Sequence, residues 1–200
     1  MQIRLSGRVV LVLLLFVALA VPAFARGKKT EATTEPGTYK EWGPDIDQIE
    51  IVKKFKFADY KDIVVVPLNT ADVDKKDKAV ETVIGTATED FADELKKQVK
   101  TNVTVDATPK KSSDALIIRT KVVNMEPGSR AKRYLASFGA GAAVVKVEGE
   151  IVDAKSNKVL ARFTQERRSG FGVAGGSSES LLRRDLRALA TDVANILKAF

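Results

Sequence analysis

The sequence predicts an α+β two-layer fold, a mixed, mostly antiparallel sheet of four to five strands with two helices packed on one face. Three observations lead to this prediction. Apolar residues alternate with polar ones in several short segments, as in strands. They recur every third or fourth position in two longer segments, as in amphipathic helices. The order is strand, helix, short strand, three strands and helix, which favours helices grouped on one side of a sheet.

Residues 1–25 have the three parts of a cleavable secretory signal peptide. A basic start precedes an unbroken apolar run at residues 9–21, and the small residues Ala23 and Ala25 follow it. The run of thirteen residues is shorter than the roughly 20 that span a bilayer as a helix. We therefore expect cleavage after Ala25 and an exported, periplasmic or secreted chain that is soluble and does not span the membrane.

A linker and one domain are expected after the signal. Residues 26–47 are rich in Lys, Glu, Thr, Pro and Gly, which predicts a flexible linker before a single α/β domain at residues 48–200. Trp42 is the exception and is expected to pack on the domain edge. Residues 48–57 alternate in part, which predicts an edge strand or an extended arm. The β-branched run within residues 62–68 predicts a strand buried on both faces, at the centre of the sheet.

The rest of the domain changes period twice. Apolar residues spaced three or four apart predict a helix over residues 77–100. A short strand at 103–106 and a longer one at 115–125 follow. Residues 145–151 and 159–163 alternate around a short polar turn, which predicts a hairpin with one face in water.

A Leu-rich stripe predicts the final helix over residues 178–199. Before the first helix, Asp72, Asp74 and Asp77 lack the glycine and the bidentate glutamate of a calcium loop. They are expected to cap the helix instead, because a carboxylate is favourable at a helix N-terminus.

The composition excludes several chemistries, because the chain has no histidine and no cysteine. Nucleophiles that depend on histidine or cysteine, disulfides and the usual zinc, haem and iron–sulfur sites are therefore ruled out. The formal net charge is +7, and acidic residues are interspersed among the basic ones, so nucleic-acid binding is not expected. We expect no metal and no cofactor.

A family resemblance covers about residues 55–200. It depends on these stretches: Tyr60-Lys-Asp-Ile-Val-Val-Val-Pro67, Gly128-Ser-Arg-Ala-Lys-Arg-Tyr134, Phe138-Gly-Ala-Gly-Ala-Ala143, Ile151-Val-Asp-Ala154 and Lys158-Val-Leu-Ala-Arg162. The chain resembles the bacterial exported family called domain of unknown function 4410. Many members look like lipoproteins with a cysteine after the signal, which this chain lacks. The resemblance implies an envelope setting and no assigned catalytic residues.

The candidate site is a Gly/Arg-rich edge. Residues 170–175 match G-x-G-x-x-G, but the chain has no later parallel strand with the acidic residue of a dinucleotide site. If the hairpin turns at Ser156 and Asn157, both Gly-rich loops meet at one edge, beside the start of the last helix. The residues that an anion or acidic partner would contact there are Arg130, Lys132, Arg133, Arg167, Arg168, Gly175, Gly176, Ser177 and Ser178. In the alternative interpretation the glycines form tight turns, the arginines are solvated and Ser177 or Ser178 is only an N-cap.

These observations favour a non-catalytic binding or assembly module of the cell envelope, not an enzyme. Its expected partner is an envelope protein or an anionic surface. The alternative is a carboxylate-dependent hydrolase, with Glu148, Glu150 and Glu166 as the nearest candidates for acid–base residues. Such carboxylates must converge in a pocket to act together.

Overall fold

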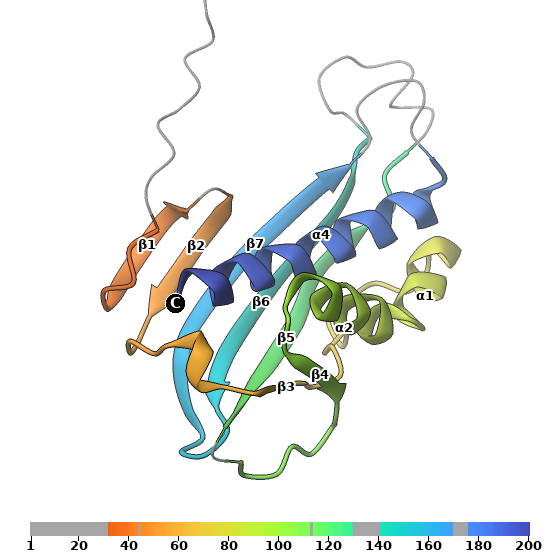
Figure 1. Cartoon of the computed structure of the whole chain (residues 1–200). Coiled ribbons are helices and arrows are strands. Elements are labelled where there is room, and N and C mark those ends of the chain that lie inside the picture. The colour runs from red at the N-terminus through yellow and green to blue at the C-terminus, as the bar shows by residue number, and fades with distance from the viewer. Residues whose placement is uncertain (1–31, 44, 113, 130–140, 170–175) are drawn as a thin grey trace, which may run out of the picture.

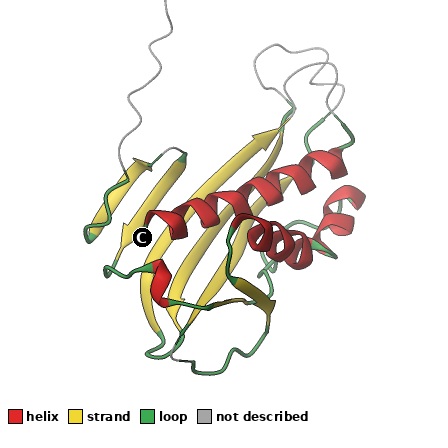
Figure 2. Cartoon of the chain, viewed as in Figure 1, coloured by secondary structure: helices red, strands yellow, loops and turns green. Residues whose placement is uncertain are grey.

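The computed structural model describes residues 32–43, 45–112, 114–129, 141–169 and 176–200. Its described part is a seven-stranded sheet with helices on one face (Figures 1 and 2). The strands are β1 (Gly37–Trp42), β2 (Ile46–Ile51), β3 (Asp62–Val65), β4 (Asn102–Val105), β5 (Ala115–Glu126), β6 (Ala143–Asp153) and β7 (Lys158–Ser169). The helices are α1 (Lys78–Ile84), α2 (Ala87–Gln98) and α4 (Ser178–Ala199), with a 3-10 turn at Phe57–Asp59.

The strands lie in the order β1-β2-β7-β6-β5-β3-β4. Strand β3 pairs in parallel with β4 and β5, and the other strand pairs are antiparallel. The parallel pairing of β3 and β4 is possible because α1 and α2 form the crossover between them. The predicted class, a mixed, mostly antiparallel sheet with helices on one face, is therefore confirmed.

The predicted numbers of strands and helices are wrong, because the described residues form seven strands and three α-helices. The helix expected over residues 77–100 is broken at Gly85 and Thr86 into α1 and α2. Glycine costs about 1 kcal/mol relative to alanine inside a helix, so the break falls where continuation is least favourable. Asp77 caps α1 as expected, and its carboxylate accepts a hydrogen bond from the Ala79 N–H at 2.8 Å.

Strand β1 lies inside the segment that the sequence placed in the linker, residues 26–47. Trp42 ends this strand and is 2% exposed. Its Nε1 donates to the Thr33 carbonyl at 2.8 Å, and its ring stacks on that of Phe200 with centroids 6.2 Å apart. Trp42 therefore packs on the domain edge, as predicted. The composition does not reveal β1, because Tyr39 and Trp42 are its only large apolar residues that pack on the core.

The positions of β2 and β3 in the sheet differ from the prediction. Strand β2 lies between β1 and β7 and is not an edge strand. Strand β3 was expected at the centre but lies next to the edge strand β4. Its Ile63 and Val65 are buried under the helices, while Val64 on the other face is only partly covered. A β-branched run therefore predicts burial and does not predict the place of a strand in the sheet.

The predicted hairpin is confirmed, with longer strands than expected. Strands β6 and β7 pair along their length, and the turn contains Ser156 and Asn157, the latter with φ of +55°. Gly149 of β6 stands opposite Phe163 of β7, and a Cβ at Gly149 would lie 2.1 Å from the Phe163 ring. The missing side chain of Gly149 therefore makes room for the aromatic ring that covers it.

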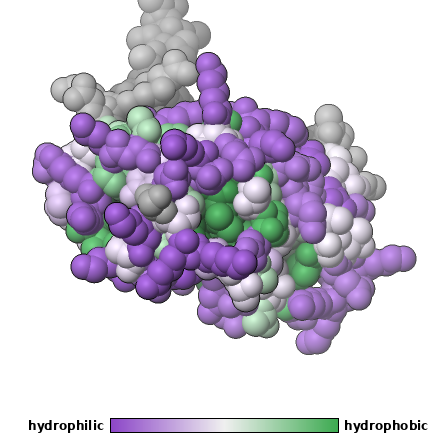
Figure 3. Space-filling view, turned by 60° about the horizontal axis from the view of Figure 1, so that its bottom comes forward, coloured by the Kyte–Doolittle hydropathy of each residue, from purple (hydrophilic) through white to green (hydrophobic). Residues whose placement is uncertain are grey.

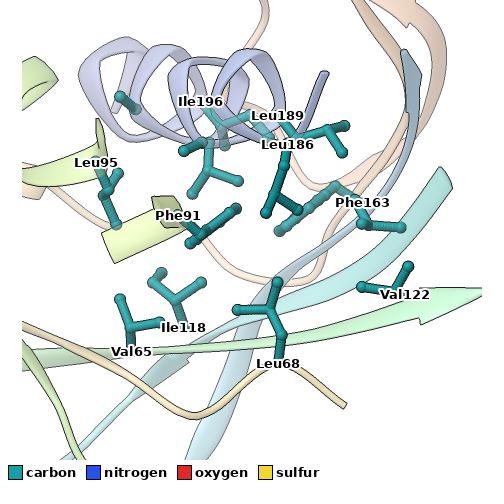
Figure 4. Packing of buried hydrophobic residues seen from close by; sticks show 14 of the residues in the cluster. Val65, Leu68, Phe91, Leu95, Ile118, Val122, Phe163, Leu186, Leu189 and Ile196 are labelled. Atoms are coloured by element: carbon teal, nitrogen blue, oxygen red, sulfur yellow. The ribbon is translucent and has the colours of Figure 1, made fainter. Parts of the chain in front are cut away.

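The hydrophobic core lies between the sheet and the helices (Figure 4). Leu186, Leu189 and Ile196 of α4 and Phe91 and Leu95 of α2 point toward the sheet. From the sheet, β5 and β7 direct apolar side chains toward them. Full burial of each such side chain contributes about 2 to 3 kcal/mol, so these two helix faces are the main source of stability.

Candidate functional site

One end of the sheet is where both Gly-rich segments leave the domain, and we call it the loop end. Residues 130–140 and 170–175 lie outside the described part of the chain, but the residues next to them are placed. The Ser129 N–H donates to the Gly141 carbonyl at 3.0 Å, which closes the base of the first segment. Ser169 pairs with Ala143 at the same end. The start of β6 and the end of β7 therefore meet at this end of the sheet, while the predicted meeting of the two segments themselves stays a prediction.

Several predicted site residues lie outside the described residues. They are Arg130, Lys132, Arg133 and Gly175 of the Gly/Arg-rich edge, together with Ala23 and Ala25 of the signal. Arg167, Arg168, Gly176, Ser177 and Ser178 are described, and the structure places them in different environments.

Arg167 points into the domain. Its guanidinium donates from Nε to Asp192 of α4 at 2.6 Å, and it forms an ion pair with Asp45 at 2.6 Å. Burial alone would lower the pKa of Arg167, but the bonds to Asp192 and Asp45 outweigh burial and raise it. The Arg167 side chain therefore connects β7, α4 and the β1–β2 turn and is already fully engaged within the domain.

Arg168 faces the other side of the sheet. Its side chain is 63% exposed and its Nε lies 2.5 Å from a Glu166 carboxylate oxygen. Exposed ion pairs contribute about 0 to 1 kcal/mol, so a ligand can displace this one at little cost. Among the described arginines of the predicted site, Arg168 is the one available to a partner.

The start of α4 lies at the loop end. Ser177 is the N-cap, and its Oγ accepts a hydrogen bond from the Ser180 N–H at 3.1 Å. Gly176 precedes it, and a Cβ there would lie 2.3 Å from the Ser180 Oγ. Helix α4 begins at Ser178. Ser177 therefore has the capping role that the alternative interpretation gave it, and the positive end of the α4 dipole points toward the loop end.

A buried polar cluster lies just below the loop end and was not predicted. Asp185 of α4 is 3% exposed and accepts a hydrogen bond from the Ser169 hydroxyl. Arg184 also donates to that hydroxyl, at 3.0 Å. The second carboxylate oxygen of Asp185, Oδ2, is buried and has no hydrogen-bond partner among the described residues. Burial raises the pKa of Asp185, against the opposing effects of Ser169 and Arg184.

A neighbouring cluster contains Asp192, which is also 3% exposed. Gln165 of β7 donates to its Oδ2 at 3.0 Å and to the Asp45 carbonyl at 2.8 Å. Burial raises the pKa of Asp192, and the hydrogen bonds from Arg167 and Gln165 counter part of that effect. The sequence contained a signal for both clusters, because Asp185 and Asp192 are seven positions apart on the apolar face of α4.

The sheet face opposite the helices carries a shallow groove with a cavity volume of about 570 Å³. Polar and charged residues of β2, β5, β6 and β7 line most of it. Glu150 lies in the groove with Arg162 of β7 at 3.1 Å, and the same Arg162 lies 3.1 Å from Glu50 of β2. Each of these carboxylates therefore has a guanidinium partner.

Two of the three hydrolase residues named from the sequence lie in this groove, and the third does not. Glu148 and Glu150 line the groove, and Glu166 is bonded to Arg168 and is not among the lining residues. Within the described part of the chain, no group of three or more acidic residues could hold a metal ion.

Figure 3 shows that hydrophilic residues form most of one face of the molecule, with hydrophobic ones gathered near its centre.

None of the helices in the described part of the chain combines the length and the apolar composition that a membrane-spanning helix requires.

The model of the family described as "Domain of unknown function (DUF4410)" matches residues 47–174. No curated protein sequence matches the chain significantly. The PelC dodecamer from Paraburkholderia phytofirmans matches with a TM-score of 0.50 and 18% identity, over 72% of this chain and 94% of that chain.

Two further solved structures are similar. A hypothetical protein from Chlamydia trachomatis has a TM-score of 0.49 and 10% identity, over 70% of this chain and 99% of that chain. A lipoprotein from Neisseria meningitidis has a TM-score of 0.36 and 13% identity, over 67% of this chain and 98% of that chain. At such identities the similarity concerns the fold alone.

Proposed function

Because the chain belongs to the DUF4410 family, which names no activity, we propose a function from the geometry. The protein is an exported, non-catalytic binding or assembly module that contacts an anionic partner through its loop end. Export is supported by the signal-like residues 1–25. An assembly role is in keeping with the PelC dodecamer from Paraburkholderia phytofirmans, to which the fold is similar.

One observation carries the proposal: both Gly-rich segments leave the domain at the same end, beside the first turn of α4. The first of these segments contains Arg130, Lys132 and Arg133, and Arg168 is exposed at the base of the second. Basic side chains next to the positive end of a helix dipole attract anionic groups. Arg167 is not part of this surface, because Asp192 and Asp45 hold it inside the domain.

A non-catalytic role is supported by the chemistry of the groove. Two of its carboxylates, Glu50 and Glu150, share Arg162 between them. Both carboxylates are therefore already engaged in an ion pair with the same guanidinium, and this arrangement supports a structural role for them. The chain also has no histidine or cysteine that would act in its place.

The test compares two variants that each lose four positive charges. The first, R130Q/K132Q/R133Q/R168Q, neutralises the loop end. The control, K110Q/K111Q/K155Q/K158Q, neutralises the opposite end, which carries the β4–β5 loop and the β6–β7 turn. Each basic residue near an anionic membrane contributes about 1 kcal/mol. We therefore expect the first variant to bind phosphatidylglycerol vesicles at least tenfold more weakly than the wild type, and the control to bind like the wild type.

Two outcomes of this experiment would contradict the proposed role of the loop end. Equal binding by the two variants would show that only net charge matters, and absence of wild-type binding would remove the anionic surface as a partner. A photo-crosslinking residue at position 168, compared with one at position 158, then tests for an envelope protein. Crosslinks from position 168 alone would support the loop end as the contact, and equal crosslinking would contradict it.

A further inference from the structure

A row of alternating charges crosses the sheet face opposite the helices. It contains Glu50 of β2, Arg162 of β7, Glu150 of β6 and Arg119 of β5, which stand opposite one another in the strand register. The nitrogen–oxygen distances along it are 3.1 Å, 3.1 Å and 4.0 Å. We call these four residues the charge row. All four side chains keep between 35% and 48% of their exposure, so they remain accessible to another molecule.

The order of charges, negative, positive, negative, positive, reverses sign when the row is read backwards. A second copy turned about an axis parallel to the strands presents the row in reverse order. Glu50 then faces Arg119 of the other copy, and Arg162 faces Glu150, so every contact pairs opposite charges. An axis in the plane of the sheet but perpendicular to the strands would instead place each residue against the same residue of the other copy. That arrangement would create four like-charge contacts.

From this complementarity we propose that the open sheet face binds a second copy of this chain, sheet against sheet, with the strands of both copies in line. The interface is isologous, since the same patch is used on both copies. It goes beyond the proposed loop-end function, because it uses a different surface and a different partner. No helix among the described residues lies on this face (Figure 1).

The neighbouring rows are compatible with the same axis. On one side of the charge row lie Ile117, Val152 and Val159, apolar residues from β5, β6 and β7. In the reversed copy the position of Val152 faces that of Val159. Val152 and Ile117 are already buried within their own chain, so this row brings no charge into the contact. On the other side, Lys121 and Glu148 face the uncharged residues of β2 and β7 in the same register. No like charges meet in these three rows.

The size of the patch predicts a weak complex. Four strands and five residues along each cover about 20 Å by 17 Å of sheet. This area is small compared with the total of roughly 1,200 Å² that stable complexes bury at the least. We therefore expect dimers at protein concentrations on the order of 100 µM, and fewer of them as salt rises, because exposed charges are screened.

Charge reversal at Glu50 and Arg119 separates contacts between copies from contacts within one chain. These residues are three strands apart in one chain, about 14 Å, which exceeds the screening length of roughly 8 Å at physiological salt. Between copies they are direct partners. Sedimentation velocity of the purified protein should therefore show that E50R and R119E each dimerise at least tenfold more weakly than the wild type.

Mixing the two variants is the decisive measurement. In a mixed dimer the new Arg faces the new Glu, and the native Arg119 faces the native Glu50, so both contacts are again favourable. We expect the mixture and the double variant E50R/R119E to regain wild-type dimerisation. The controls E81R and K155E make the same charge changes at exposed sites away from the row and should dimerise like the wild type.

Two results would overturn the proposal. One is a wild-type protein that stays monomeric at about 200 µM in low salt, where interactions between exposed charges are strongest. The other is a mixture of E50R and R119E that remains as weakly associated as its components. Vesicle binding by these variants keeps the two proposals apart, because reversal of Glu50 or Arg119 leaves the loop end intact.

Discussion

At the scale of single residues, Asp185 is a buried carboxylate whose hydrogen bonds are incomplete within the described part of the chain. A buried carboxylate is tolerated when hydrogen bonds satisfy both of its oxygens. Here Ser169 satisfies one of them, while Oδ2 has no partner among the described residues. The charge of Asp185 is therefore a liability in the folded state, whereas its protonated form is not.

Because of this cost, the free energy of unfolding depends on pH in a direction that can be predicted. Because burial raises the pKa of Asp185, the folded state binds the proton more tightly than the unfolded state does. Stability from this group is therefore full at low pH and is lost as the pH rises through the raised pKa. Asn at this position has no charge to lose. We expect the free energy of unfolding of the wild type, relative to D185N, to fall as the pH rises from about 4 to 7.

Urea unfolding across this pH range measures the difference. D93N, at an exposed position of α2, is the control for the removal of one carboxylate. A difference between D185N and the wild type that stays constant over this pH range would contradict the expected effect of burial at Asp185.

At the scale of elements, Asp90 connects two helices. It lies in α2 and accepts hydrogen bonds from Arg183 and Arg187 of α4, the latter at 2.6 Å. The Thr86 hydroxyl adds a third at 3.0 Å. Burial alone would raise the pKa of Asp90, but these three hydrogen bonds outweigh it and lower the pKa. The ion pairs hold α2 against α4 above the apolar contacts.

Removal of this charge should loosen the helix layer. Hydrogen bonds to charged groups contribute about 1.5 to 3 kcal/mol each, and part of this is recovered by water at a partly exposed site. We expect D90N to lower the free energy of unfolding by about 2 kcal/mol at neutral pH. The difference should shrink at acid pH, because the contribution of a carboxylate with a lowered pKa is lost as the pH falls.

Thermal and urea unfolding measure this effect. E89Q, which changes an exposed carboxylate of the same helix turn, is the matched control. An equal effect of the two substitutions would mean that the ion pairs of Asp90 add nothing specific.

The elements also show what the sequence predicts and what it does not. The stripe of α4 and the alternation of β6 and β7 are set by burial against one core, so periodicity reveals them. Strand β1 escaped prediction because it depends on pairing with β2. This region is held in turn by hydrogen bonds between Gln165 and residues Asp47 and Asp45, which lie 118 and 120 positions earlier in the chain. The candidate site was predicted only in part: Arg167 and Arg168 are neighbours in sequence, but the pleat sends one inward and one outward.

At the scale of the whole molecule, aromatic stacking joins the two ends of the domain. Phe200 stacks on Trp42 with centroids 6.2 Å apart and on Phe55 at 4.3 Å. The Phe57 N–H also donates to the Phe200 carbonyl at 3.3 Å. The end of α4 thus holds both β1 and the segment that follows β2.

Truncation of this contact should release the β1–β2 pair first. Loss of a fully buried Phe costs about 3 to 5 kcal/mol, and Phe200 is partly exposed, so we expect F200A to cost about 2 kcal/mol. Hydrogen exchange should rise in residues 37–51 before the rest of the sheet. V105A, at a side chain that is 46% exposed on β4, is the control and should change stability by less than about 0.5 kcal/mol. Uniform exchange in F200A would contradict a local role.

The pairing of β2 with β7 sets the order in which the domain is able to fold. The Arg162 side chain and the Glu50 side chain that it bonds are 112 positions apart in the chain. As the chain emerges from a ribosome or a translocation pore, β1 and β2 can pair only with each other until β7 follows. The last helix must then arrive before Trp42 has its stacking partner. Closure of this domain is thus a late event that depends on nearly the complete chain, and until then the early segments stay extended and open to chaperones.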